Sequence, residues 1–591
     1  MMPAPARSPD WGSATAIGVA ASLVALALQQ GVRTAWQVRS LPERVMEWLL
    51  VFVPLDLFER GLQQFGANAK DLALAGTLVG MAILLIVVGA LTVRSVSSGW
   101  LALLVGLGLW LFAMVIVMPA TGAGLFATGL LVSPVLTDAS YLFVFGGYSA
   151  VLALGTDVVR QRDRVRPGQP RGPASRQRRS LLAGLAGMLA TVAAYGAARA
   201  AAGSGGVVQS SLPLASAPTS IPTPTDAATA TPLATAGGAA AAATPASMAT
   251  PSVPPSPTAA PAGLPTPPPA RALARDQEGS LTAARRAAGT LAPAITSNQD
   301  FYVVTKNAVA DPVVDANGWR LIIDGEVEHP VQVDYATLRA LPVVEITKTL
   351  ECISNLTAGC NMASFGCDLI STAVWRGARL TDVLNLAGGL RSKVVTVAFL
   401  ALDEFSSALP PEAVLDPEAL IVYEMNGQVL PREHGYPARL LVPGRYGMKN
   451  PKWLAGIRAL NQPYVDWYQQ RGWTKDGIVK MMSRIDVPAD GVSLAPGPQR
   501  VAGIAYAGDR GIRLVEVSAD GGTTWQPASL LEPAPGKDAM VRFEATFQMA
   551  DTPVTLVVRA TDGAGVVQPD DFGLPAPDGG WGQDSIQVMP A

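Results

Sequence analysis

The chain has 591 residues and a formal net charge of -2, from 44 Lys and Arg against 46 Asp and Glu. This length exceeds what one compact core accommodates, and the near-zero charge gives no electrostatic reason to expect a nucleic-acid partner. Hydrophobic residues make up 49% of the chain and charged residues only 15%, and the apolar surplus lies in the N-terminal third. The composition therefore indicates a membrane part joined to a water-exposed part.

The N-terminal region holds several apolar segments without charge. Five of them are long enough, or nearly so, to cross a bilayer as a helix, and they cover residues 14–28, 72–93, 99–118, 139–156 and 181–202. A shorter apolar segment, Met46–Phe58, contains Glu47, Pro54 and Asp56, which favours a helix lying in the membrane interface. We predict a membrane domain over residues 1–202 with five transmembrane helices, four or six being the alternatives.

The orientation of this domain is indicated by its arginines. Residues 160–179 contain eight Arg and one Asp, and such a segment stays in the cytoplasm. The N-terminus is then cytoplasmic, and everything after about residue 203 is outside. The alternative interpretation of this Arg-rich segment is a nucleic-acid-binding patch, which the neighbouring membrane segments disfavour. Arg178 and Arg179, just before an apolar segment, also resemble a twin-arginine export signal; a stop-transfer charge is an equally good interpretation.

Residues 203–295 have the composition of a linker. Between residues 211 and 270 almost every residue is Pro, Ala, Thr, Ser or Gly, and Asp226 is the only charge. Such a segment cannot bury enough apolar surface to fold, and its prolines favour an extended conformation. We expect a disordered tether that holds the following domain away from the membrane.

The rest of the chain has the patterns of two folded domains. Strand-like segments at residues 319–327 and 394–403 and a helix-like segment at 380–390 predict a mixed α+β domain over residues 296–478. Alternating segments follow at residues 512–525, 541–549 and 555–565, the first of them running into a Gly-Gly turn. They predict an all-β, immunoglobulin-like sandwich over residues 479–591.

Several cofactors are disfavoured by what the sequence lacks. The only two histidines, His329 and His434, follow the membrane segments, so a membrane haem held by two histidines is excluded within this chain. There is no Cys-x-x-Cys-His motif, and three cysteines cannot hold a four-cysteine iron–sulfur cluster. No G-x-G-x-x-G follows a strand and no P-loop is present, so NAD, FAD and nucleotide cofactors are not expected.

Cys352 lies in "LPVVEITKTLECISN", where an apolar, β-branched run gives way to a loop. A lone cysteine is ordinarily a packed structural thiol, but a thiolate is also a soft ligand for a redox metal. Cys360 and Cys367 are close in sequence and either form a disulfide or remain two free small residues.

The segment around Cys352 resembles the stretch that supplies the molybdenum-binding cysteine in the sulfite oxidase family. Further segments come in that family's order, at residues 301–307, 319–342, 422–454, 483–491 and 501–525. The last of them resembles the family's C-terminal dimerisation domain. The resemblance implies a molybdenum–molybdopterin cofactor with Cys352 as metal ligand and catalytic residue. It also implies two-electron oxygen-atom transfer by a membrane-anchored extracytoplasmic enzyme, with a homodimer as an expected assembly.

The resemblance also assigns the remaining site residues. Arg and Lys suit the cofactor's phosphate, and the matched cofactor contacts are Thr305, Lys306, Asp403, His434, Arg439, Asn450, Pro451 and Lys452. Without the ordered match, each of these would more often be a surface charge or a turn residue. Trp473 falls where the family has an active-site tyrosine, and we expect it to be catalytic.

The sequence departs from the family where cations help to hold an anionic substrate. Val304, Leu356 and Thr357 stand at positions where sulfite oxidases have arginines, so sulfite is not expected to be the specific substrate. One alternative is a reductase of S-oxides or N-oxides, as in the related methionine sulfoxide branch. The other is a cofactor-free binding module on a stalk. The expected partners of an enzyme are a small-molecule substrate, a separate cytochrome or quinone as electron carrier, and membrane lipid.

Overall fold

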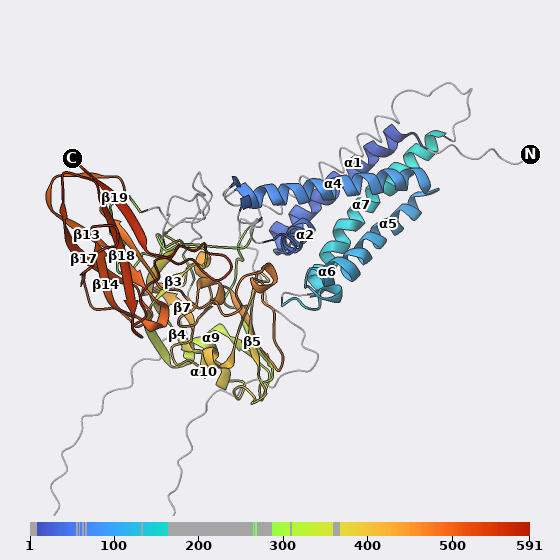
Figure 1. The fold of residues 1–591 in the computed structure, drawn as a ribbon. Helices are drawn as coiled ribbons and strands as arrows, with labels where there is room; N and C mark the ends of the chain where they lie inside the picture. Colours follow the sequence, from blue (N-terminus) through green and yellow to red (C-terminus); the bar gives the residue numbers. More distant parts are fainter. Residues whose placement is uncertain are drawn as a thin grey trace, which may run out of the picture.

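The computed structural model describes residues 9–54, 68–131, 134–163, 286–307, 310–357 and 367–591, with a few single positions at 57–65 and 264–268. The N-terminal part is helical (Figure 1). Its elements are α1 (Trp11–Trp36), α2 (Leu41–Leu50), α4 (Asn68–Ser95), α5 (Gly99–Phe112), a π-helical turn (Ala113–Val117), α6 (Met118–Ala120), a 3-10 turn (Leu125–Ala127) and α7 (Pro134–Asp163).

Four of these helices, each long and apolar enough to cross a membrane, cover Trp11–Trp36, Asp71–Ser95, Gly99–Ala120 and Pro134–Arg160. They coincide with the first four predicted spans. The fifth, at residues 181–202, and most of the Arg-rich segment lie outside the described residues.

The helices approach one another closely at small residues. A Cβ added to Gly89 of α4 would lie 2.8 Å from the Cα of Gly18 in α1, and one added to Gly106 of α5 would lie 2.5 Å from the Cβ of Ser149 in α7. Packing on small side chains is how helices associate in lipid, where no hydrophobic effect draws them together.

The α+β unit contains two sheets. The first has the order β2-β1-β10-β5-β6, in which β1 and β10 are parallel. Its strands are β1 (Arg320–Gly325), β2 (Val331–Asp334), β5 (Thr396–Ala401), β6 (Ser406–Leu409) and β10 (Leu454–Leu460). The second has the order β3-β4-β7-β8, with β9 paired to β7. Its strands are β3 (Val343–Glu351), β4 (Ile370–Arg379), β7 (Leu420–Met425), β8 (Gln428–Val429) and β9 (Arg439–Leu441).

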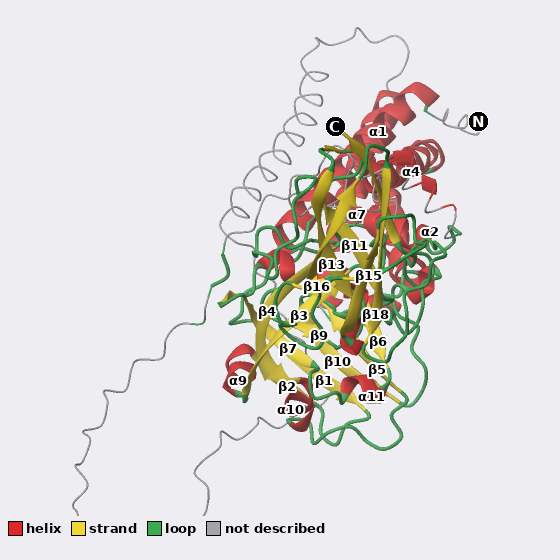
Figure 2. Ribbon diagram, turned by 60° about the vertical axis from the view of Figure 1, so that its left-hand side comes forward, coloured by secondary structure: helices red, strands yellow, loops and turns green. Residues whose placement is uncertain are grey.

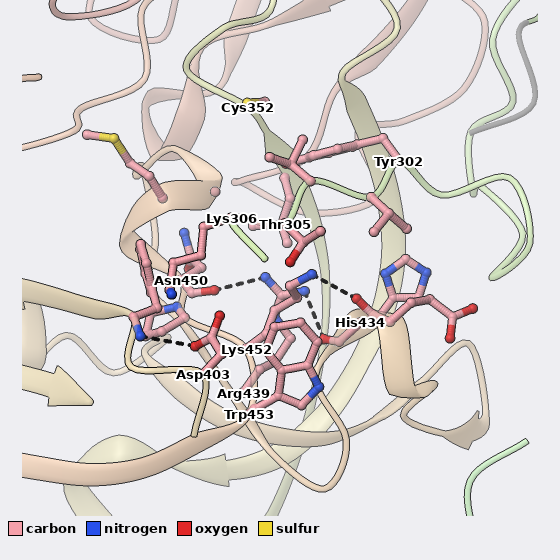
Figure 3. A pocket seen from close by; sticks show the side chains of 18 of the residues that line it. Tyr302, Thr305, Lys306, Cys352, Asp403, His434, Arg439, Asn450, Lys452 and Trp453 are labelled. Carbon is pink, nitrogen blue, oxygen red and sulfur yellow. Dashed lines mark hydrogen bonds between the residues drawn. The ribbon is translucent and has the colours of Figure 1, made fainter. Parts of the chain in front are cut away.

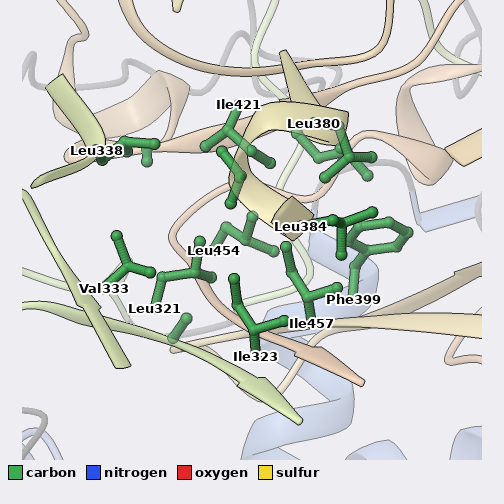
Figure 4. Close-up of a cluster of buried hydrophobic side chains, with 14 of the residues drawn as sticks. Leu321, Ile323, Val333, Leu338, Leu380, Leu384, Phe399, Ile421, Leu454 and Ile457 are labelled. Atoms are coloured by element: carbon green, nitrogen blue, oxygen red, sulfur yellow. The ribbon is translucent and has the colours of Figure 1, made fainter. Parts of the chain in front are cut away.

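The main core of this unit lies between the two sheets and three short helices, α9 (Tyr335–Ala340), α10 (Leu380–Asn385) and α11 (Pro411–Val414). Figure 4 shows side chains of β1, β5, β7 and β10 meeting those of α9 and α10. Trp319, fully buried beside β1, donates from its indole nitrogen to the carbonyl oxygen of Leu454 at 2.9 Å. The predicted α+β class is therefore confirmed.

The C-terminal region is an all-β sandwich, as predicted (Figure 2). One sheet has the order β11-β13-β17-β16 and the other β12-β19-β18-β14-β15. The strands are β11 (Met482–Val487), β12 (Ser493–Leu494), β13 (Gly497–Tyr506), β14 (Ile512–Ser518), β15 (Gln526–Pro527), β16 (Ser529–Leu530), β17 (Val541–Met549), β18 (Val554–Asp562) and β19 (Asp584–Pro590). The expected Gly-Gly turn joins β14 to β15, which pair antiparallel.

The sandwich braces strand β3 of the α+β unit. Buried Lys348 of β3 pairs with Asp538, and the Tyr506 hydroxyl donates to the Asp538 carboxylate at 2.6 Å. The Thr349 hydroxyl accepts the backbone N–H of Met540 at 2.8 Å. A strand fixed in this way holds its C-terminal end, and the residue that follows it, in a defined place.

The expected tether lies largely outside the described residues and stays a prediction, but the α+β unit is not held apart from the helices. Arg44 of α2 forms an ion pair with Glu404 of the α+β unit, so the two parts are in contact. Parts of the predicted linker are also ordered, since Leu264 packs against the main core and Arg286 pairs with Asp486. The helix predicted over Met46–Phe58 begins earlier, at Leu41, because Ser40 and Glu43 form a capping box there.

Candidate active site

Cys352 follows directly on β3 and begins a tight turn. The N–H of Asn355 donates to the Cys352 carbonyl at 2.9 Å, and the Asn355 side chain joins Glu351 to the backbone of Leu369. Asn355 therefore closes the turn that presents the cysteine. The thiol is free and 8% exposed, and burial raises its pKa.

Cys352 lines a partly open cavity, together with residues from several separate segments of the α+β unit. Its walls come from the loop before β1, the end of β3, the β5–β6 hairpin and the segment from residue 433 to 453. Figure 3 shows Cys352 and Tyr302 at one end of the cavity and Asp403, Arg439 and Lys452 at the other. The thiol thus faces a long cavity with distinct ends.

Aromatic side chains surround the thiol end. Tyr302, Phe405 and Tyr468 line the cavity. Burial, and secondly the charge of a Cys352 thiolate, raise the pKa of Tyr302 and Tyr468 well above the usual value. Both phenols therefore stay protonated at neutral pH, and their hydroxyls are able to donate a hydrogen bond. Trp473 does not reach the cavity lining: it packs edge to face behind Tyr468, with ring centroids 6.1 Å apart.

The opposite end is cationic. Arg439 donates to the backbone carbonyls of His434 and Asn450 at 3.1 and 2.9 Å, and Lys452 donates to that of Glu433 at 2.9 Å. Burial lowers the pKa of Lys452 and lowers that of Arg439 to about 10. Within the part of the chain that the structure describes, both cations donate to backbone carbonyls and neither forms an ion pair with a carboxylate. The buried Arg439 Nε has no hydrogen-bond partner.

A buried guanidinium beside a half-buried ammonium, neither with a carboxylate partner, is costly unless an anion joins them. The donor set therefore fits the phosphate end of a molybdopterin, while the thiol at the far end suits its metal. The thiol at one end and the cations at the other support the molybdopterin cofactor that the sequence resemblance implied.

The first loop and the β5–β6 hairpin form a polar side wall. The Asp403 carboxylate accepts from the Asn307 side chain at 3.2 Å and from the Phe405 N–H at 3.1 Å. Thr305 donates its hydroxyl to Asp311 at 2.6 Å. Burial raises the pKa of Asp403, with Lys306 opposing the shift.

The other predicted contacts also line the cavity, and some of their polar groups are already hydrogen-bonded within the protein. Pro451 and Asn450 line the cavity, but the Asn450 side chain is fully used by backbone groups of residues 442, 445 and 446. The His434 ring lies edge-on against Phe301, at 5.2 Å between centroids, and its Nε2 lies 3.1 Å from the Asn298 carbonyl oxygen. All the predicted cofactor contacts line the cavity, and of the predicted site residues only Trp473 does not.

Tyr302 and Tyr468 were not predicted from the sequence. Tyr468 comes five residues before Trp473, and the 3-10 turn Gln469–Arg471 between them decides which ring faces inward. Tyr302 belongs to the "FYVVTKN" segment, in which the aromatic pair Phe301 and Tyr302 was the available signal.

No cation replaces the missing arginines at the thiol end among the described lining residues. Val304 lines the cavity, and Leu356 and Thr357 are buried. Two nearby cations are engaged elsewhere: Lys449 pairs with Asp466 at 2.5 Å, and Arg471 lies over the Trp467 ring. The thiol end is therefore aromatic and weakly polar.

Cys367 is disulfide-bonded, which agrees with the pairing considered for it. Cys360, its expected partner, lies outside the described residues. The arrangement leaves Cys352 as the free thiol.

Comparison with known proteins agrees with this site. Residues 308–468 match the family described as oxidoreductase molybdopterin binding domain, and residues 468–574 match the Mo-co oxidoreductase dimerisation domain. The matched families meet at residue 468, ten residues before the predicted domain boundary.

Individual relatives with similar sequences include sulfite oxidases. Sulfite oxidase of Arabidopsis thaliana is 30% identical over 312 residues, which cover 44% of this chain and 79% of the relative. Sulfite oxidase of Gallus gallus is 32% identical, covering 47% and 68%. The mitochondrial sulfite oxidase of Rattus norvegicus is 31% identical, covering 50% and 62%, so this chain spans less than two thirds of that relative.

Among solved structures, the sulfane dehydrogenase SoxCD from Paracoccus pantotrophus is 25% identical, with a TM-score of 0.43 over 48% of this chain and 76% of that one. The identity and coverage of the plant and chicken relatives, together with the two matched domains, establish the family. The chain belongs to the sulfite oxidase family of molybdopterin-dependent oxidoreductases.

Proposed function

We propose that this protein is a membrane-anchored, extracytoplasmic molybdenum-cofactor enzyme that carries out two-electron oxygen-atom transfer. The observation that carries the proposal is the cavity with a free thiol at one end and, at the other, buried Arg439 and half-buried Lys452 without a carboxylate partner. Cys352 would hold the metal, and Arg439 and Lys452 would hold the phosphate. When bound, the cofactor supplies the oxygen-atom and two-electron chemistry.

The protein's own contribution is orientation and water exclusion. Asp403 and the backbone groups around Asn450 form the polar walls against which a pterin would be aligned. Tyr302 and Tyr468, protonated at neutral pH, are placed to donate a hydrogen bond to a substrate oxygen near Cys352. Fixed donors in a dry site stabilise developing charge more than donors in water do.

The thiol end of the cavity is poorly suited to a small dianion. A charge-assisted hydrogen bond contributes about 1.5–3 kcal/mol, and the thiol end lacks the arginines that would provide several of them. Sulfite would therefore bind weakly, although the family relationship keeps it a candidate. The same observation favours a second function, reduction of a neutral S-oxide or N-oxide, whose oxygen the tyrosine hydroxyls would bind without a charged clamp.

Several features support the membrane location. Trp11 and Trp36, at the two ends of α1, are both exposed, as are Trp100 at the start of α5 and Trp48 on α2. Tryptophan is enriched at membrane interfaces. The C-terminal end of α7 lies away from the α+β unit (Figure 1), and the Arg-rich segment follows it in sequence. Because arginine-rich segments stay in the cytoplasm, this arrangement supports an extracytoplasmic α+β unit.

The chain requires partners for turnover. Both of its histidines, His329 and His434, follow the membrane helices, so those helices offer no histidine ligand to a haem. We therefore propose that a separate cytochrome or quinone exchanges the electrons. The dimerisation domain supports a homodimer.

The test is a Cys352→Ala variant of the full chain, purified in detergent from a host that makes the cofactor. Wild type should contain about one molybdenum per chain and turn over with either reduced viologen and a panel of S- and N-oxides, or sulfite and ferricyanide. The variant should lose turnover and remain folded, because the change removes a single sulfur atom from a side chain that lines the cavity. A fully active variant would refute the assignment, and molybdenum-free wild type would favour a cofactor-free binding module.

A further inference from the structure

The turn between α1 and α2 meets the α+β unit beside the cavity. We call residues 33–47 the α1–α2 corner. Its Arg44 forms a two-fold hydrogen-bonded ion pair with Glu404, at 2.7 and 2.6 Å, and Arg39 reaches the same carboxylate at 3.5 Å. Arg44 is 3% exposed, and the α2 face that carries it is buried. The contact therefore has the geometry and burial of a built interface.

A second contact joins the corner to the first cofactor loop. The Lys306 ammonium lies 3.3 and 3.4 Å from the two carboxylate oxygens of Glu47, which also pairs with Arg39. The backbone carbonyl of Glu47 accepts from Arg471 at 3.0 Å. These interactions hold the Glu47 carboxylate in place, and the paired cations hold its pKa well below the usual value.

A third contact secures the far side of the same loop. The Gln37 side chain accepts the N–H of Val313 at 2.9 Å and donates to its carbonyl at 3.1 Å, and Arg33 donates to the carbonyl of Ala310 at 3.1 Å. The loop from Lys306 to Val313 is thus attached to the corner at both ends.

The first two contacts act on residues of the cavity wall. Lys306 and Asp403 both line it, and Glu404 directly follows Asp403. Glu404 has a φ of +64°, a backbone conformation that residues other than glycine adopt only at an energetic cost. The ion pair with Arg44 stabilises this turn, and the turn fixes the direction in which Asp403 points.

The Glu47 carboxylate compensates the positive charge of the buried Lys306 ammonium. The ammonium is buried, and burial lowers its pKa, with Arg39 acting in the same direction and Glu47 opposing. Without Glu47, a buried cation would be left unpaired, and the loop would move to return it to water.

We propose that the α1–α2 corner is part of the cofactor-binding site, with Glu47 and Arg44 as positioning residues that hold Lys306 and the 403–404 turn against the cofactor. The inference rests on the proposed function. It gives the membrane part a role beyond anchoring, because retention of the cofactor then depends on the α1–α2 corner.

The test compares full-length proteins in detergent. Glu47→Gln removes one charge without changing shape, and Glu404→Gln breaks the Arg44 contact from the side of the α+β unit. The matched control is Arg458→Gln, which breaks a similar paired contact with Asp324, at 2.7 and 2.8 Å, on the exposed face of strand β10. Molybdenum per chain and the release rate of the pterin are measured, together with hydrogen exchange of residues 303–307 and 402–406 in cofactor-free protein.

Both interface variants should release the cofactor at least about fivefold faster than wild type and exchange faster in the two segments. The control should match wild type in both measurements. Wild-type cofactor release by Glu47→Gln and Glu404→Gln would overturn the inference, whether or not exchange changes. Wild type without molybdenum would overturn the proposed function, and unchanged exchange in cofactor-free protein would separately overturn the positioning role.

Discussion

The buried ion pair of Lys449 and Asp466 joins two walls of the cavity. The Lys449 ammonium lies 2.5 Å from the Asp466 carboxylate, with side-chain exposures of 0 and 2%. Met448 and Asn450, the neighbours of Lys449, both line the cavity, and Asp466 is two residues before Tyr468. We predict that Lys449→Met destabilises the protein and disturbs the position of Tyr468.

The size of the effect follows from what the variant leaves behind. Removing one partner of a buried pair costs about 3–5 kcal/mol. Asp466 would still accept two backbone N–H groups, those of Ala408 at 3.1 Å and Gln469 at 3.0 Å. These bonds place the expected loss of unfolding free energy near the lower end, about 3 kcal/mol. For a folded unit of this size, that loss lowers the melting temperature by about 6–12 °C.

Thermal unfolding of the full chain, followed by tryptophan fluorescence, measures this loss. The double variant Lys449→Met, Asp466→Asn should recover more than half of it, because no buried charge remains unpaired. A melting temperature of Lys449→Met within about 1 °C of wild type would refute the reasoning. An equal loss in the single and double variants would show that packing, and not charge, is responsible.

Two other predictions concern single groups. Tyr468→Phe removes a hydroxyl donor but keeps the ring, so turnover should fall about tenfold or more while molybdenum content stays at the wild-type value; equal turnover would exclude a donor role. Burial raises the pKa of Asp584 to about 6, with Arg484 opposing the shift and Asp486 reinforcing it. The folded state then binds more protons than the unfolded state between about pH 4 and 6, so this group's contribution to stability falls as pH rises through that range. Asp584→Asn should therefore raise the melting temperature more at about pH 7.5 than at about pH 4.5, and an equal change at both would contradict the prediction.

Local patterns in the sequence were enough to predict the membrane helices, several strands and the turn at Cys352. Uncharged apolar runs give the four helices that match predicted spans, since a helix that crosses lipid needs a continuous apolar surface. Alternation gave β17 and β18 nearly to the residue. The position of Cys352 was also readable, because a β-branched run ends there and Asn355 closes the turn within three residues.

Tertiary structure decided which side chains meet. Tyr468 and Trp473 are five residues apart in an aromatic segment, and only the packing of the turn between them places Tyr468 in the cavity and Trp473 behind it. Lys306 and Glu47 are 259 positions apart, and nothing local to either residue indicates the other. The composition of the linker suggested that the α+β unit stays apart from the membrane helices. The buried ion pairs at the α1–α2 corner form only when both folded parts are present, so no local sequence pattern could indicate them.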